Sequence, residues 1–222
     1  MKMSKALPLL LAVLAGVSAR AADPDFSMKL RGIAGLETKE GVRNGIGVGF
    51  NVGIPITSGS KIDVELGYRY LAGDGQNVAI PTNTIGATMD NATNFQKTNV
   101  QGFSLRGSYS QSFGVDNLSW HAGLAVNSLK SRMDAIGDFT AVPGGITGSW
   151  SYNPEKTATT VSPFVGIGYA FSESGGLEAN LIMDSYKQVT LTPAFAGTTV
   201  TPTIGSKNIN TLKIEIGYTF RF

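Results

Sequence analysis

Residues 213–222, KIEIGYTFRF, indicate the fold class of this chain. Large apolar side chains recur at every second position, and the residues between them are charged, small or polar. A period of two is typical of a β-strand whose faces meet different surroundings, because successive side chains point to opposite sides. The apolar face carries Leu212, Ile214, Ile216, Tyr218, Phe220 and Phe222, and the other face carries Lys213, Glu215, Gly217, Thr219 and Arg221.

The same alternation recurs upstream as far as residue 27. In 44–56, for example, Ile46, Val48 and Phe50 alternate with glycine and asparagine. No stretch in this region has the pattern of a long amphipathic helix. We predict eight strands, at residues 27–39, 44–56, 61–73, 97–113, 118–133, 157–171, 177–191 and 208–222.

The predicted connections alternate in length. Those at 40–43, 57–60, 114–117 and 172–176 are short, and those at 74–96, 134–156 and 192–207 are long. Near-equal strands joined by hairpins are typical of an up-and-down antiparallel barrel. Such a barrel closes by pairing its first and last strands, which leaves no exposed sheet edge. After the first hairpin, all the short turns fall at one end and all the long loops at the other.

Composition narrows the function classes. Charged residues make up 15% of the 222 residues, there is no cysteine, and His121 is the one histidine. The chain therefore has no disulfide scaffold, no thiolate metal site and no cysteine nucleophile. It also lacks the run of about 20 apolar residues that a transmembrane helix needs.

The first residues have the features of a secretory leader. Lys2 and Lys5 precede an apolar stretch at 6–17, and Ala19-Arg20-Ala21 has the small-x-small pattern of a cleavage site. We therefore predict a signal peptide at 1–21 and a barrel domain at 22–222. The domain carries 15 basic and 16 acidic residues, which gives no support to a nucleic-acid partner.

The apolar face is predicted to point outward, into lipid. An eight-stranded barrel has an interior just wide enough for side chains to fill, and five or six large apolar residues per strand would not fit there. The other face is rich in Gly, Ser and Ala, as a narrow interior requires. Aromatic residues gather at the short-turn rim, as expected at a lipid–water boundary: Phe26, Phe113, Trp120, Tyr169, Phe171, Tyr218, Phe220 and Phe222.

From 27 to 222 the chain resembles the small outer-membrane barrels of bacteria of the OmpA, OmpX and Opa kind. The most specific element is the last strand, in which Phe222 follows Phe220 and Tyr218. The resemblance implies an assembly signal at Tyr218, Phe220 and Phe222, read by the barrel-assembly machinery. It also implies a place in the bacterial outer membrane, with short turns in the periplasm, long loops outside the cell, and periplasmic chaperones and outer-membrane lipid as partners.

Strand parity directs a balanced set of charges into the lumen. The basic members are Lys29, Arg31, Arg69, Arg106, Lys213 and Arg221, and the acidic members are Glu37, Asp63, Glu65, Glu178, Asp184 and Glu215. Opposite charges in a narrow interior should pair, because an unpaired buried charge is costly. We expect a network that plugs the barrel; a selectivity lining for a small pore is the alternative.

The function predicted from the sequence is non-enzymatic: a plugged barrel whose loops serve envelope integrity or surface contact. A small porin-like channel and a lipid-modifying enzyme are the second and third alternatives. His121 in SWHAG has Gly123 where the resembling deacylases have serine, so a hydrogen bond in the lumen is its expected role. We expect no cofactor and no metal.

Two features stay open at the sequence level. The long loops contain exposed apolar residues such as Ile80 and Phe195, which either form a contact surface or extend the strands beyond the membrane. Pro163 lies inside the sixth strand although it cannot donate to a ladder, so we expect a bulge there, above the bilayer.

Overall fold

The computed structural model describes residues 24–36, 42–78, 83–84, 87–92, 94–114, 117–142, 146–196 and 199–222. The predicted leader at 1–21 and Glu37 lie outside these residues. Within them, no helix is long and apolar enough to cross a membrane.

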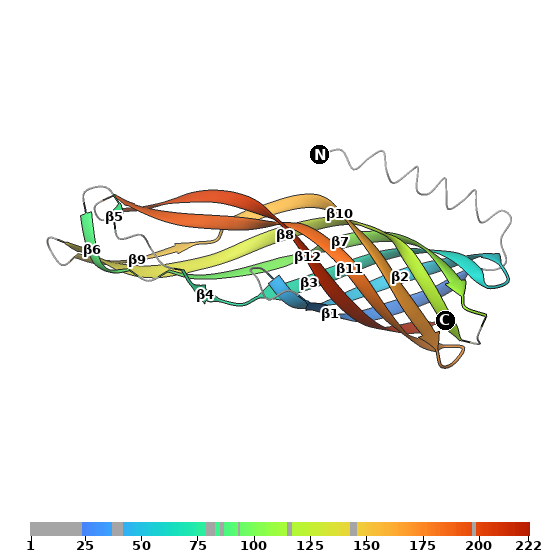
Figure 1. The fold of residues 1–222 in the computed structure, drawn as a ribbon. Helices are drawn as coiled ribbons and strands as arrows, with labels where there is room; N and C mark the ends of the chain where they lie inside the picture. The colour runs from blue at the N-terminus through green and yellow to red at the C-terminus, as the bar shows by residue number, and fades with distance from the viewer. Residues whose placement is uncertain are drawn as a thin grey trace.

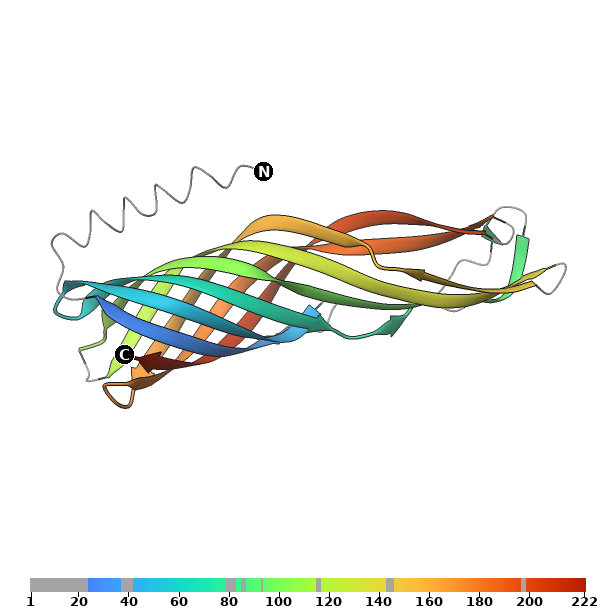
Figure 2. The same cartoon turned by 180° about the vertical axis from the view of Figure 1, so that it is seen from behind.

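Eight long strands of the described chain form a closed ring (Figures 1 and 2). Each pairs antiparallel with its neighbours in the order β7-β3-β2-β1-β12-β11-β10-β8, and the ring closes because β7 also pairs β8. The strands are β1 (Asp25–Gly35), β2 (Val42–Thr57), β3 (Ser60–Gly73), β7 (Phe95–Ser112), β8 (Leu118–Val142), β10 (Glu155–Ala170), β11 (Gly175–Ala196) and β12 (Thr199–Arg221). The predicted up-and-down barrel, closed between first and last strands, is confirmed.

Three strands are about twice as long as a membrane crossing requires. β8 has 25 residues, β11 has 22 and β12 has 23, whereas a tilted transmembrane strand needs about 9–11. The surplus forms an extension beyond one end of the barrel, which includes the short strand β9 (Ile146–Tyr152) paired to β8. Figure 1 shows this extension at the left and the short turns at the right.

The predicted long connections are therefore partly strand. β11 and β12 stay paired from Gly175↔Phe220 to Ala196↔Thr199, so 192–207 is mostly a continued hairpin rather than a loop. Strand extension, one of the two alternatives for the apolar residues in this segment, is observed. The connection 74–96 contains β4 (Gln76–Asn77), β5 (Asn83–Thr84) and β6 (Ala87–Ala92).

The predicted bulge at Pro163 is wrong, and a different irregularity takes its place. β10 pairs β8 without a register shift from Glu155↔Arg132 to Tyr169↔Leu118, with Pro163 opposite Leu124. On its other side, β10 pairs β11 only from Phe164↔Ile182 to Ala170↔Gly176. The β10–β11 ladder thus ends beside a residue that has no N–H to extend it.

Above that point, side chains replace backbone pairing between β10 and β11. The Thr160 hydroxyl donates to the Ser185 carbonyl at 2.5 Å, and the Ser185 N–H donates to Ser162 Oγ at 3.3 Å. We call this break in the wall, from Pro163 to the tip, the seam. It lets the β11–β12 hairpin separate from β10 and pack elsewhere.

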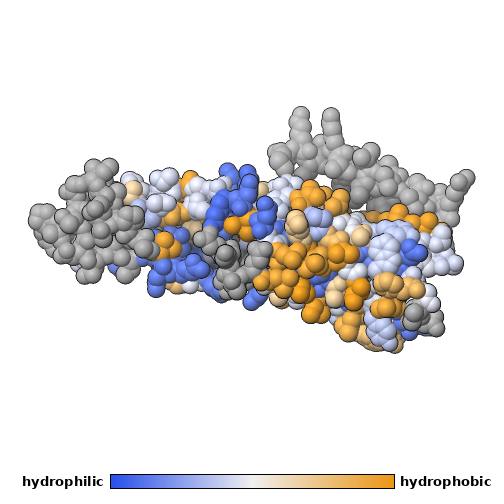
Figure 3. Space-filling model, viewed as in Figure 1, coloured by the Kyte–Doolittle hydropathy of each residue, from blue (hydrophilic) through white to orange (hydrophobic). Residues whose placement is uncertain are grey.

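The outer surface of the barrel is apolar around the half that carries the short turns. Ile216 is 62% exposed and Phe103 is 61% exposed, and Figure 3 shows hydrophobic residues gathered over this part of the barrel on the face in view. We call these outward apolar side chains the apolar belt. Above the belt, the outward positions of β8 change from Leu124 and Val126 to Lys130 and Arg132. The predicted outward direction of the apolar face is confirmed.

Aromatic rings lie at the short-turn rim, where they were predicted. Ring pairs there include Phe171 with Tyr218 at 5.7 Å between centroids and Tyr218 with Phe220 at 4.3 Å. Farther along the outer wall, Tyr68 packs edge-on against Phe103 at 5.2 Å. Aromatic rings at the edge of an apolar belt are the expected marker of a bilayer interface.

Candidate functional site

The lumen contains a network of buried ion pairs built from strands on different sides of the barrel. Its centre is Arg31 on β1, whose guanidinium reaches two carboxylates. Both terminal nitrogens of Arg31 donate to Glu65, with Nη2 at 2.5 Å from Oε2, and Nε donates to Glu178 Oε1 at 2.5 Å. Lys29 donates to the other Glu178 oxygen at 2.8 Å. Parity along three strands, β1, β3 and β11, directs all of these groups into the lumen.

A second pair crosses the lumen from β7 to β12. Arg106 Nη1 and Nη2 donate to the two Glu215 oxygens at 2.6 and 2.7 Å. The guanidinium carbon of Arg106 also lies 5.5 Å from the centre of the Phe164 ring. A bidentate pair with an aromatic face beside it fixes the guanidinium plane as well as its charge.

The third pair lies nearer the extension. Arg69 Nη2 donates to Asp184 Oδ1 at 2.7 Å, and Lys213 Nζ lies 2.9 Å from Asp184 Oδ2. Lys213 Nζ is also 5.0 Å from the centre of the Tyr186 ring. Lys213, Asp184 and Glu215 are completely buried. We call the set Arg31, Glu65, Arg69, Arg106, Glu178, Asp184, Lys213 and Glu215 the charge plug.

The remaining predicted lumen residues lie toward the short-turn mouth. Asp63 accepts hydrogen bonds from Ser110 at 2.5 Å and from Asn51 at 3.0 Å, and Lys61 lies 3.2 Å away. Arg221 lies at the mouth itself, where it lines an opening together with Lys29 and Lys61. Arg221 is thus placed apart from the charge plug.

Inward glycines make room for the charge plug. A Cβ on Gly49 would lie 2.3 Å from Glu65 Oε1, and a Cβ on Gly217 would lie 2.9 Å from Glu178 Cγ. Both carboxylates are held by Arg31, so neither can move aside without breaking its pair. Gly49 and Gly217 are therefore required by close approach.

His121 has a hydrogen bond in the lumen, as its sequence context predicted. Its Nε2 contacts Asn180 Oδ1, and its ring lies 6.2 Å from the Phe164 ring. The Ser119 hydroxyl donates instead to the Gly168 carbonyl at 3.4 Å. The two side chains therefore have separate partners and do not form a base–nucleophile pair. Among the described residues, no three His, Cys, Asp or Glu side chains lie together as metal ligands would.

A layer of buried apolar side chains lies above the charge plug. It consists of Ile33, Leu71, Val100, Leu129 and Tyr186, with Ile209 packed against it. We call it the apolar layer. Leu71 and Val100 have no exposed surface, so buried hydrocarbon follows the ion pairs along the lumen.

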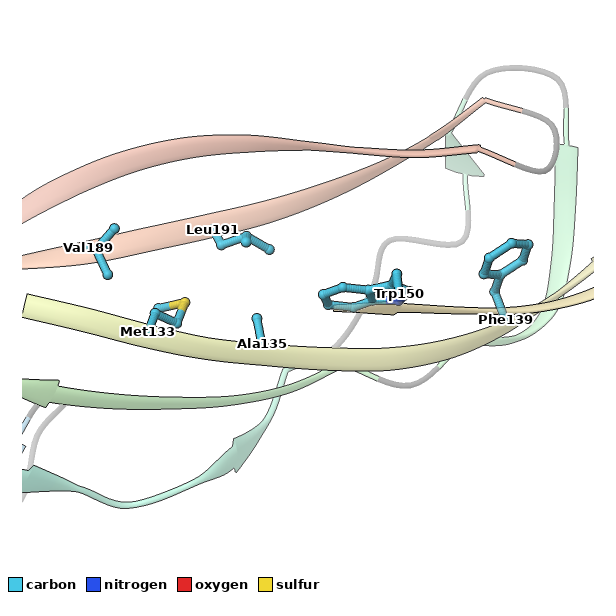
Figure 4. Close-up of a cluster of buried hydrophobic side chains, with 6 residues drawn as sticks. All are labelled: Met133, Ala135, Phe139, Trp150, Val189 and Leu191. Atoms are coloured by element: carbon cyan, nitrogen blue, oxygen red, sulfur yellow. The ribbon is translucent and has the colours of Figure 1, made fainter. Parts of the chain in front are cut away.

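The extension has an apolar core of its own. Figure 4 shows Met133, Ala135 and Phe139 of β8 and Trp150 of β9 facing Val189 and Leu191 of β11. The Val189 N–H donates to Ser131 Oγ at 3.1 Å, and the Tyr152 hydroxyl donates to the Val200 carbonyl at 2.7 Å. The hairpin released at the seam is therefore packed against β8 and β9.

Sequence reasoning missed the apolar layer and the apolar core of the extension. It also missed the uncharged side chains that hydrogen-bond to the polar residues of the lumen. Ile33 and Leu71 follow the same parity as Arg31 and Arg69, so a count by two places them inside the barrel. The signal was present but was overlooked because these residues are apolar. Nothing in the sequence paired Asn180 with His121, because that contact joins β11 to β8.

The location of the molecule follows from this geometry. A closed antiparallel ring satisfies the backbone without water, its exterior is an apolar belt with aromatic residues at the short-turn rim, and charged side chains line its interior. The chain is an outer-membrane β-barrel. Its short turns and both ends of the strand ring lie at one rim, and the extension projects from the opposite rim.

Comparison with known proteins adds similarity of architecture only. No family model matches this barrel, and no curated protein matches it in sequence. The solved structures that resemble it include the attachment invasion protein Ail of Yersinia pestis in complex with a heparin analogue, with 9% identity, 90% of this chain and 97% of that chain covered, and a TM-score of 0.48. A major outer-membrane protein of Thermus thermophilus is 12% identical, with 90% of this chain and 100% of that chain covered and a TM-score of 0.47. Neisserial surface protein A is also 12% identical, with 91% of this chain and 99% of that chain covered and a TM-score of 0.44.

Proposed function

We propose that this outer-membrane barrel is non-enzymatic and non-conducting, and that it presents its extension for surface contact or adhesion. The observation that carries the proposal is the contrast between a lumen lined by buried ion pairs and apolar side chains and an extension that has an apolar core of its own. Binding sites usually lie on segments that a rigid scaffold positions.

The charge plug alone would leave a polar path for ions through the lumen. The proposal that the barrel does not conduct therefore depends on the apolar layer. A row of Leu71, Val100 and Leu129 offers no hydrogen-bonding group to a hydrated ion. Ions conduct through narrow pores only where polar groups replace their hydration shell. A small porin is therefore the less favoured function, and it is tested directly by conductance.

Assembly partners form a second part of the proposal. Tyr218, Phe220 and Phe222 end the last strand at the periplasmic rim, and Phe222 is 81% exposed. A side chain that packs so little contributes little to folding, which leaves it available as a signal for the barrel-assembly machinery. Periplasmic chaperones and outer-membrane lipid are the other expected partners.

The test separates the extension from the barrel. Lys187 pairs with Asn208, so a two-residue Asn-Gly turn joining them replaces 188–207 without changing the register below. Asp138 pairs with Ser149, so the same turn replaces 139–148. The shortened protein should keep its heat-modifiable gel migration and lose attachment of expressing cells to host cells or to neighbouring bacteria.

Planar-bilayer recordings complete the test on the same preparations. The full chain and the shortened barrel should both show no steady ion-selective steps, because the charge plug and apolar layer are intact in each. Regular steps from the full chain would favour the small porin. Unchanged attachment after shortening would contradict surface contact through the extension.

A further inference from the structure

One edge of the extension is an unpaired β-strand. Within the barrel, β12 has β11 on one side and β1 on the other. The ladder with β1 ends at Gly35↔Lys213, whereas the ladder with β11 continues to Ala196↔Thr199. Over 199–211, no strand of the described chain pairs with β12 on the β1 side. An edge of this kind presents a row of free backbone N–H and C=O groups, which is a template for pairing with another chain.

The backbone groups of successive residues point to opposite sides of a strand, and two observations identify the outward ones. The Leu36 N–H donates to the Leu212 carbonyl at 3.0 Å from the β1 side. Farther along, Pro193 lies opposite Pro202, and residues without an N–H cannot exchange the two bonds of a hydrogen-bonded pair. The even-numbered residues of β12 therefore direct their N–H and C=O groups away from β11.

The tip end of this edge is closed. The outward carbonyl of Val200 accepts a hydrogen bond from the Tyr152 hydroxyl at 2.7 Å, and Pro202, the next outward position, has no N–H. Proline on an edge strand is a usual protection against pairing with other chains. The opposite edge of the hairpin is also covered, because the Val189 N–H and the Leu191 carbonyl of β11 are bonded to side chains of β8 and β7.

Three outward positions between Pro202 and the end of β1 remain open: Ile204, Ser206 and Asn208. All three side chains are exposed. Among the described residues, none bonds to their outward N–H or C=O groups. These groups recur at every second residue, about 6.8 Å apart at the usual rise of a strand. Another extended backbone has the same spacing, so it can satisfy all of these groups at once.

A second copy of this chain does not fit the edge. Two upright copies in one membrane would run parallel, and a parallel ladder places an outward residue opposite an inward one. A two-fold pair instead places each residue opposite itself, so the required stagger is lost. Copies in facing membranes would run antiparallel, and pairing through all three positions centres on Ser206. Thr199 of one copy would then lie opposite Lys213 of the other, a place that Gly35 of β1 already occupies.

We propose that the edge of β12 binds an extended segment of another protein by strand addition, with the pairing centred on Ser206. The incoming strand would continue the wall beyond the end of β1. Main-chain hydrogen bonds supply the affinity in this mode of recognition, and side chains beside the edge supply the preference. Ile204 is 55% exposed and favours a β-branched or aromatic residue opposite it. The expected partner is therefore a short extended peptide with alternating β-branched residues, paired along 204–208.

The inference rests on the proposed function, because it names the class of partner that the extension would contact. Its tests use purified protein, so their results do not depend on whether cells attach.

Amide hydrogen exchange of the full chain in nanodiscs tests whether the edge is open. The three outward amides should exchange fast, whereas the amides at 203, 205 and 207 face β11 and should exchange slowly. Slow exchange at all six amides without any ligand would show that the edge is already covered. Protection of the outward amides that rises with protein concentration would assign the edge to a second copy, and would contradict the inference.

The probe for binding is the pentapeptide acetyl-Thr-Val-Thr-Val-Thr-amide, whose β-branched residues favour an extended backbone. Titrated into the same nanodiscs, it should shift the NMR signals of the outward amides more than those of the amides between them, and should slow their exchange. The same peptide N-methylated at every residue has no N–H donor and should not bind. Equal shifts at inward and outward amides would indicate contact through side chains and would contradict strand addition.

Ser206→Pro removes the central outward N–H at a position where the β11 ladder needs none, as Pro202 does naturally. It should weaken peptide binding by about fivefold or more, the loss expected when one net hydrogen bond is removed. Ser206→Ala keeps the N–H, so it is the matched control and should bind as the wild type does. Heat-modifiable migration reports folding of each variant, and the methylated peptide decides the question if Ser206→Pro does not fold.

Two further results would overturn the inference: no saturable binding of the pentapeptide, or equal binding of the methylated peptide. If either occurs while the shortened chain still loses cell attachment, strand addition is disproved and the proposed function stands. If the peptide pairs with the edge but attachment does not depend on the extension, strand addition stands and the proposed function fails.

Discussion

Arg106 and Glu215 join opposite sides of the barrel through two hydrogen bonds of 2.6 and 2.7 Å. Along the ring, β3, β2 and β1 separate the strands that carry them. A contact of this kind can form only when all the intervening strands have the correct register, because a one-residue slip turns a side chain to the other face.

We expect Glu215→Gln to lower the free energy of unfolding by about 3–5 kcal/mol, because it leaves Arg106 buried without its counter-charge. Urea titration followed by heat-modifiable gel migration measures the change. The double variant Arg106→Met with Glu215→Met should recover most of the loss. Lys130→Met, which breaks the exposed Lys130–Glu155 pair, should cost less than about 1 kcal/mol.

Gly49→Ala should destabilise the barrel by about 1–3 kcal/mol, the usual range for overpacking. Its Cβ would lie 2.3 Å from a Glu65 oxygen that Arg31 holds in place. Gly107→Ala is the control, since nothing lies within 4 Å of a Cβ there. Equal urea midpoints for the two variants would show that the plug can shift to admit a methyl group.

Ile216→Arg tests the orientation of the barrel wall. Ile216 faces outward in the middle of the apolar belt, and an arginine near the bilayer midplane costs about 2–4 kcal/mol. Thr157→Arg, also outward but above the belt, should cost less than half as much. The readout is the yield of folded protein in lipid vesicles at increasing urea, and a reversed order of the two variants would contradict the assigned belt.

Removal of Phe222 should impair assembly in cells more than folding in detergent. The ring is 81% exposed, so its loss removes little packing, and the backbone N–H bond to the Phe26 carbonyl at 3.1 Å is the main contact given up. Surface labelling of intact cells measures assembly. A parallel loss of refolding in vitro would point to a packing role rather than a signal.

Leu191→Ala should loosen the extension without opening the barrel. Leu191 is 5% exposed within the core of Figure 4, and truncation of a buried leucine costs about 2–5 kcal/mol. Limited proteolysis should then cut within 187–208, while heat-modifiable migration is retained. Ile204→Ala, at a 55% exposed position of the same hairpin, should leave the cleavage rate unchanged.

The strand pattern could be predicted from the sequence because a membrane barrel wall has a simple period. Lipid outside and a narrow lumen inside impose opposite demands on successive residues, so Lys213 and Ile214 identify their faces without further information. Strand ends were harder to predict. Above the bilayer both faces of β11 and β12 meet water or protein, and segments such as 192–207 lose the clean alternation although their backbones stay paired.

Which charges face the lumen follows from parity, but which charges pair does not. Arg31 was placed inside by counting, yet its choice of Glu65 and Glu178 depends on the stagger between strands far apart in the chain. The contact between β7 and β11 is subject to the same limit. Gln96 donates to the Leu191 carbonyl because the seam lets β11 fold toward β7, and the local sign of the seam is Pro163.

The early end of the β10–β11 ladder has a practical consequence for protein engineering. Strand number and stagger, which set the diameter of the cylinder, are determined below Pro163 by pairs such as Phe164↔Ile182. Residues beyond that proline can be lengthened, shortened or exchanged without altering those parameters. The molecule thus offers a natural display platform, on which foreign peptides grafted at the tip would leave the embedded portion undisturbed.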